Sequence, residues 1–73
     1  MKGKVKRFKG KKSWSELVGT AGHAATIIIE RQNENVDAII VEEGSSVSTD
    51  VRCDRVRIFV DENDIVKEVP KVG

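Results

Sequence analysis

The chain has 73 residues, of which 34% are charged and only 4% are aromatic, so we expect one small domain with a mainly aliphatic core. No apolar run approaches the roughly 20 residues of a membrane-spanning helix, and Met1 leads into Lys2 and Gly3 rather than into an apolar signal sequence. The sequence therefore predicts no membrane segment and no signal peptide, and it leaves the location cytoplasmic or undefined.

The first predicted element is a flexible basic arm, residues 1–12, which holds seven of the 13 basic residues and no acidic residue: Lys2, Lys4, Lys6, Arg7, Lys9, Lys11 and Lys12. Residues 13–73 hold six basic and 12 acidic groups, a formal charge of −6. A basic run is typical of a contact with nucleic acid or an anionic membrane, or of a solvated chain end. Because nucleic-acid-binding segments gain from interleaved aromatic side chains and only Phe8 is present, we favour the solvated end and expect no nucleic-acid partner.

The next two elements are predicted to be helical. The segment SWSELVG indicates a short turn in which Trp14, Leu17 and Val18 share a face. Residues 22–33 predict a helix, because apolar residues recur at the i, i+3, i+4, i+7 spacing of one helix face. These residues are Ala21, Ala24, Ala25 and Ile28, and Ile29 and Gln32 flank the face. The expected core joins these elements to the later strands: Trp14, Leu17, Val18, Ile27, Ile28, Ile29, Ile39, Ile40, Ile58, Phe59 and Val60.

Two alternating runs predict neighbouring strands at residues 36–43 and 55–60. The first run separates Val36, Ala38 and Ile40 from Ile39 and Val41, and the second separates Val56, Ile58 and Val60 from Arg55, Arg57 and Phe59. Residues 61–64 predict a turn, and residues 65–69 predict a third strand that closes an antiparallel hairpin. The expected fold class is α+β: a small mixed sheet with a parallel central pair and that hairpin, one helix packed on it, and a long exposed loop.

The loop is the polar connection GSSVSTDVRCDR, residues 44–55, between the two main strands. Its only large apolar residues are Val47 and Val51. Parallel neighbours need a crossover of about a dozen residues or more, normally a helix, and long loops without secondary structure are often functional. We therefore expect this loop to be the part of the chain that carries the function.

Two arginines are placed to hold such a loop. Arg55 and Arg57 fall on one face of the strand that follows it, where their guanidinium groups can donate to the carboxylate of Asp50 and the hydroxyl of Ser48. The alternative is a pair of solvated arginines on an exposed strand face. We favour the first reading, an arginine clamp formed by Arg55 and Arg57 on Ser48 and Asp50.

In chain order, the segments SWSELVG, IIERQN, AIIVEEG, STDVRC, RVRIFVDEN and PKVG resemble the potato inhibitor I family, and most of all its seed trypsin inhibitors. The resemblance covers residues 13–73. It implies one inhibitory domain whose exposed loop binds a serine protease as a substrate would, with a role in plant defence and the response to wounding. The resemblance also implies that the reactive bond is Thr49–Asp50 and that Arg55 and Arg57 support the loop. The residues implied to contact the enzyme beside this bond are Val47, Ser48, Val51 and Arg52.

The chain departs from the family pattern at three places. Thr49 stands where the trypsin inhibitors carry Lys or Arg, so we expect subtilisin-like or elastase-like proteases to be favoured over trypsin. Phe8 stands where the disulfide partner of Cys53 would lie, and Ser15 and Ser46 replace prolines. These changes predict a looser loop than in the disulfide-bearing relatives.

Other functions are less well supported by the residues. The single Cys53 predicts a monomer, with a dimer through this thiol as the alternative. The only histidine, His23, has no second His or Cys at metal-ligand spacing, so we expect no metal, no cofactor and no catalytic triad, and the chain is not predicted to be an enzyme. The second hypothesis is a non-inhibitory interaction protein on the same scaffold that uses the basic arm.

Overall fold

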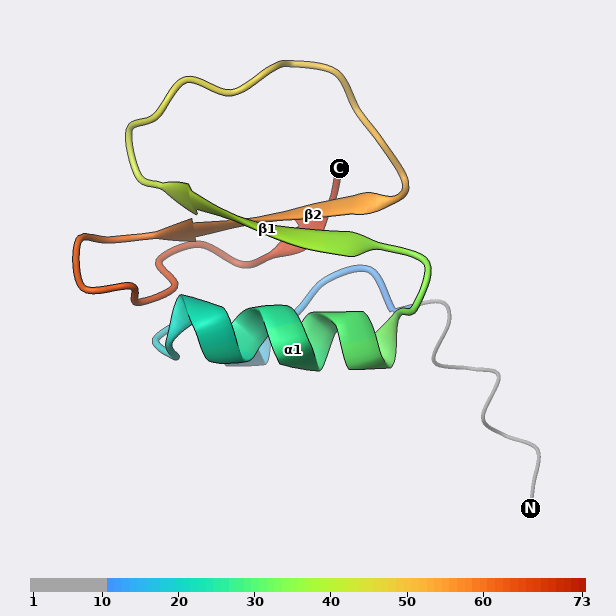
Figure 1. The fold of residues 1–73 in the computed structure, drawn as a ribbon, viewed down its shortest axis with the longest axis horizontal. Coiled ribbons are helices and arrows are strands. Elements are labelled where there is room, and N and C mark those ends of the chain that lie inside the picture. The colour runs from blue at the N-terminus through green and yellow to red at the C-terminus, as the bar shows by residue number, and fades with distance from the viewer. Residues whose placement is uncertain (1–10) are drawn as a thin grey trace.

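A computed structural model describes residues 11–73, which form one helix and a three-stranded mixed sheet (Figure 1). The elements are the short 3₁₀ turn η2 (Ser15–Leu17), the helix α1 (Gly22–Gln32) and the strands β1 (Asp37–Glu42), β2 (Arg55–Val60) and β3 (Lys71–Val72). Strand β2 lies in the centre, parallel to β1 and antiparallel to β3. The predicted α+β class and the parallel central pair are confirmed. No helix within residues 11–73 has the length and apolar character needed to cross a membrane.

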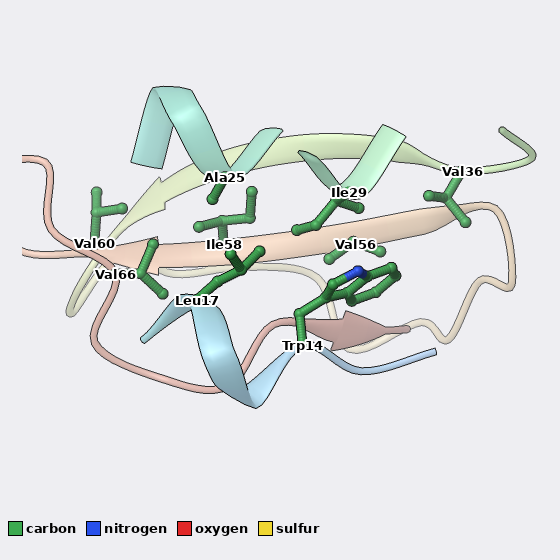
Figure 2. Close-up of a cluster of buried hydrophobic side chains, with 9 residues drawn as sticks. All are labelled: Trp14, Leu17, Ala25, Ile29, Val36, Val56, Ile58, Val60 and Val66. Carbon is green, nitrogen blue, oxygen red and sulfur yellow. The ribbon is translucent and has the colours of Figure 1, made fainter. Parts of the chain in front are cut away.

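The core lies between α1, η2 and the sheet (Figure 2). Among residues 11–73, nine buried apolar side chains form this core. They come from η2, α1, β2 and the connecting segments: Trp14, Leu17, Ala25, Ile29, Val36, Val56, Ile58, Val60 and Val66. In β2 every second residue is buried, which follows from the strand's period of two. The other face of β2, with Arg55, Arg57 and Phe59, is half-buried and points away from the helix.

Three residues of the predicted core are exposed instead: Val18 by 44%, Ile27 by 59% and Ile39 by 44%. The buried face of α1 is rotated by one residue from the predicted one and consists of Gly22, Ala25 and Ile29, so Ala21 and Ala24 face solvent. The reason lies in the contacts of Gly22, where an added Cβ would stand only 2.7 Å from Cγ1 of Val60. A glycine at this position lets the helix approach the sheet more closely than an apolar side chain would.

The third strand is not residues 65–69, as predicted, but Lys71–Val72, which pairs with Arg57 and Val56. The main chain of Val66 turns toward the segment before the helix: its amide donates to the Thr20 carbonyl (2.9 Å) and its carbonyl accepts from the Gly19 amide (2.8 Å). Ile65 and Val66 therefore make isolated bridges, to Ala21 and Val60, rather than a ladder, because the hydrogen-bonding groups of this segment are shared between two neighbours.

The turn at residues 61–64 closes the start of α1. The Asp64 carbonyl accepts from the Gly22 amide at 2.7 Å, and its carboxylate lies 2.7 Å from Nδ1 of His23. The hydrogen bond from His23 lowers the pKa of Asp64, which favours the anion at the positive end of the helix. Ala21, the residue before the helix, provides no side-chain cap, so this distant aspartate takes that role.

The structure describes only the last two residues of the predicted basic arm, and residues 1–10, including Phe8, lie outside the described part. The carbonyls of Lys11 and Lys12 accept hydrogen bonds from Asn33 Nδ2 (3.1 Å) and the Val72 amide (3.0 Å). The Lys11 ammonium also pairs with Glu16 at 2.8 Å. These two residues are thus attached to the domain.

Candidate functional site

The loop that connects β1 to β2 spans residues 43–54 and is exposed along its whole length. It leaves the sheet on the side opposite α1 and arches over that face (Figure 1). The Glu43 amide donates to the Val60 carbonyl at its start, and the Asp37 amide donates to the Asp54 carbonyl at its end, both at 2.9 Å. Both ends of the loop are therefore fixed to the paired strands, while its middle projects into solvent.

The two large apolar residues of the loop are not part of the core. Val51 is 86% exposed and Val47 is 39% exposed, and the three residues between them (48–50) are exposed as well. Loops that are held by a rigid scaffold often carry binding residues. The tip of the loop, residues 47–51, therefore offers two valine side chains to solvent on either side of three exposed polar residues.

The space under the tip is occupied by the two arginines of the predicted clamp. The Arg57 Nη2 donates to the Ser48 hydroxyl at 2.7 Å and lies 3.7 Å from Oδ1 of Asp50. The Arg55 Nη2 donates to the Asp50 carbonyl at 2.8 Å, and its Nη1 lies 3.4 Å from the Asp50 carboxylate. The arginine side chains are only 12% (Arg55) and 18% (Arg57) exposed, so their charges are held between sheet and loop.

The Asp50 carboxylate joins these contacts into one network. It accepts a short hydrogen bond from the Ser48 hydroxyl, which is the main reason why the pKa of Asp50 is lowered. The positive charge of Arg55 lowers the pKa further. Ser48 and Asp50 lie on either side of Thr49, so the network fixes both neighbours of Thr49 while Thr49 itself is exposed.

The C-terminal residue takes part in the network, which sequence reasoning missed. The Arg55 Nε donates to the Gly73 carbonyl at 2.9 Å, and the Gly73 amide donates to the Arg55 carbonyl at the same distance. The guanidinium of Arg55 is therefore divided between the chain end and the loop. A glycine at the end of a chain has no pattern that would have revealed this contact.

A second pair of charges lies on the descending side of the loop. The Arg52 guanidinium donates to both oxygens of the Asp54 carboxylate, at 2.9 Å from Nε and 2.8 Å from Nη2. This fork raises the pKa of Arg52 and lowers the pKa of Asp54. Cys53, the residue between them, is exposed and lies in a turn directly before β2.

The site holds a segment of backbone in place through side-chain hydrogen bonds. The hydroxyl of Ser48 is engaged by Arg57 and Asp50. His23, the only histidine of the chain, lies at the start of α1, where its ring contacts Asp64. Such an arrangement can present a peptide bond to another protein's active site without itself supplying a base or a nucleophile.

Three comparisons relate the chain to known proteins. The family model of the potato inhibitor I family matches residues 5–73. An inhibitor of trypsin and Hageman factor from Cucurbita maxima is 53% identical over 64 residues, which is 88% of this chain and 94% of that protein. A trypsin/subtilisin inhibitor from Amaranthus caudatus is 48% identical over 63 residues, 86% of this chain and 91% of that protein. The crystal structure of the bitter gourd trypsin inhibitor superposes with a TM-score of 0.87 at 50% identity, covering 88% of this chain and 94% of that one.

Proposed function

The chain belongs to the potato inhibitor I family and is a serine protease inhibitor, and we propose that it offers the Thr49–Asp50 bond of its loop to the enzyme as a substrate would. The observation that carries this proposal is the network around that bond. Ser48 and Asp50 are tied to β2 by Arg57 and Arg55, while Thr49 between them is exposed.

The contacts that hold the loop in place support a mode of inhibition by a substrate-like segment. An extended loop that is already ordered loses little conformational entropy when it enters an active site, so more of the contact energy remains as affinity. Residues 47 and 51 present their side chains to the enzyme from the two sides of the bond, together with Ser48 and Arg52. Their exposure supports this role for Val47 and Val51.

The same network limits hydrolysis. The enzyme's serine attacks the carbonyl carbon of Thr49, the C–N bond to Asp50 breaks, and Thr49 remains as an ester on the enzyme while Asp50 gains a free amine. Because Arg55 holds the Asp50 carbonyl at 2.8 Å, this amine stays near the ester. Its return attack restores the peptide bond and frees the enzyme's serine, in competition with water.

The identity of residue 49 supports a preference among serine proteases. Trypsin has an aspartate at the base of its primary pocket, which the short neutral side chain of Thr49 would leave without a partner. Subtilisin-like and elastase-like enzymes accept small side chains and should be bound more tightly.

A panel of proteases tests both parts of the proposal. Inhibition constants of the natural chain and of Thr49→Lys are measured against trypsin, a subtilisin and an elastase. We expect the natural chain to favour subtilisin or elastase and the lysine variant to shift toward trypsin by about a hundredfold, as expected for one added buried ion pair. Thr49→Ser is the matched control and should leave the order of the enzymes unchanged.

Two results would contradict the proposal in different ways. Strong inhibition of trypsin that does not depend on residue 49 would show that the reactive bond lies elsewhere. Absence of inhibition of every serine protease in the panel would show that the loop of this chain does not act as an inhibitory segment.

A further inference from the structure

We propose that Arg52 and Asp54 form a positioning pair that holds the segment after the reactive bond, residues 50–54, so that the new amine of Asp50 returns to the enzyme ester. This inference rests on the proposed reactive bond and assigns a role to two residues outside the arginine clamp. It concerns what happens after cleavage, when residues 50–54 become the start of a free chain end.

The contacts of the segment show why a second support is needed. Arg55 holds the Asp50 carbonyl by one hydrogen bond of 2.8 Å, and its ion pair with the Asp50 carboxylate is longer, at 3.4 Å. The next residue, Val51, is 86% exposed and therefore has almost no packing. A new chain end held at its first residue alone could swing away about that contact.

The fork between Arg52 and Asp54 supplies the support. Two parallel hydrogen bonds, of 2.9 and 2.8 Å, fix the direction of the guanidinium as well as its distance, which a single bond does not. Asp54 is in turn attached to the sheet, because its carbonyl accepts from the Asp37 amide at 2.9 Å. The exposed segment is thus connected from Arg52 through Asp54 to the start of β1.

Neighbouring carboxylates also favour the ion pair between Arg52 and Asp54. The carboxylates of Asp50 and Asp37 add to that of Asp54 in favouring the charged form of Arg52. Since both members of the pair are 54% exposed, solvent screening keeps its contribution to global stability small. The pair should therefore affect how the cut chain end is placed and have little effect on the folding of the domain.

A double-mutant cycle tests the inference. Arg52→Gln, Asp54→Asn and the double variant are incubated with a small amount of subtilisin until the ratio of cut to intact inhibitor is constant, and purified cut inhibitor is used to measure the rate of resynthesis. We expect each single variant to shift the ratio toward the cut form about twofold to fivefold, with slower resynthesis. The double variant should be no worse than either single one.

Two further variants separate positioning from other effects. Arg52→Lys keeps the charge but loses the fork, and it should behave as Arg52→Gln does. Lys67→Gln removes an exposed lysine whose Nζ lies 4.0 Å from Asp61, outside the loop, and it should leave the ratio unchanged. All variants should melt within a few degrees of the natural protein, which a merely structural role for the pair would not allow.

The outcomes distinguish this inference from the proposed function. Mass spectrometry locates the cut bond. If the bond is Thr49–Asp50 and the single variants keep the natural ratio and resynthesis rate, or if their effects add in the double variant, the positioning pair is wrong and the proposed function stands. If the cut lies at another bond, the proposed function itself fails.

Discussion

The helix-and-sheet core and the loop are stabilised by different interactions. The core is held by nine apolar side chains packed between α1, η2 and the sheet. The loop has no buried side chain, and guanidinium groups attach it to β2 and to the chain end. Since apolar burial is strong and guanidinium contacts near solvent are weak but directional, stability and inhibition should respond to different substitutions.

The largest effect is expected from opening the core. Ile58→Ala removes a fully buried side chain from the centre of β2, which should cost about 2–5 kcal/mol of unfolding free energy. Inhibition by the folded variant should change much less, because the loop is held by Arg55 and Arg57 on the other face of the strand. Urea unfolding measures the stability; a loss below 1 kcal/mol would contradict the importance of this core.

A smaller effect is expected at the contact between α1 and the sheet. Gly22→Ala places a Cβ 2.6 Å from Oδ1 of Asp64 and 2.7 Å from Cγ1 of Val60, so the helix must shift. We expect a loss of about 1–3 kcal/mol, as for other overpacked sites. Inhibition at a temperature where the variant is folded should remain as in the natural protein. Weaker inhibition by the folded variant would show that core and loop are coupled more strongly than their contacts indicate.

Substitutions in the arginine clamp should affect inhibition more than they affect stability. Arg55→Ala and Arg57→Ala should each lower the unfolding free energy by about 1–2 kcal/mol, less than the core substitution, because the arginines are largely buried but their partner Asp50 is exposed. The time for which the inhibitor survives intact with an excess of protease should fall about tenfold or more, because hydrogen bonds from a charged group to Ser48 or Asp50 are lost. Lys67→Ala serves as the control outside the loop. Equal survival of all three variants would remove the clamp from the mechanism.

The smallest effect is expected from pH, and it is confined to the loop. The pKa of Asp50 is lowered from 3.8 in the folded protein, mainly by the Ser48 hydroxyl. Because the pKa of Asp50 is lower in the folded state than in the unfolded state, its ionisation stabilises the folded protein at every pH above the pKa of the unfolded state. This stabilisation is lost as the pH falls through the pKa of the folded state. The clamp should therefore be intact at neutral pH and in weak acid.

Titration of the Asp50 carboxyl carbon by NMR checks this expectation. The midpoint should lie below 3.8 in the natural protein and move upward in Ser48→Ala, where the main cause of the shift is removed. Ser45→Ala, in the same loop but outside the network, should leave the midpoint unchanged. A midpoint at or above 3.8 in the natural protein would contradict the hydrogen bond from Ser48.

The first two strands and the loop followed from local patterns, whereas the third strand and the buried face of the helix did not. The alternation of residues 55–60 determines both the limits of β2 and its buried face, because a strand's side chains have a period of two. The helix face was wrong by one residue, because the approach of Gly22 to Val60 depends on a glycine, which carries no hydrophobic signal. Propensity likewise gives no sign that Val66 bonds to Thr20 rather than to a sheet neighbour.

Some contacts of the candidate site could likewise be predicted from the sequence, and others could not. Arg55 and Arg57 could be placed beneath Ser48 and Asp50 because all four lie within ten residues and strand geometry relates them. The contact of Arg55 with Gly73 spans 18 residues, and only the folded chain brings these groups together. The pairing of Arg52 with Asp54 is local, but nothing in the spacing distinguishes it from two separate solvated charges.

The parallel pairing of β1 and β2 has a consequence for a molecule cut at Thr49–Asp50. The part before the cut contributes five of the nine core side chains and the part after it contributes four: Trp14, Leu17, Ala25, Ile29 and Val36, then Val56, Ile58, Val60 and Val66. Neither peptide holds a complete core or a complete sheet, so each can fold only on the other. The cut inhibitor is in effect a heterodimer of two peptides, and its stability should depend on concentration as that of any dimer does.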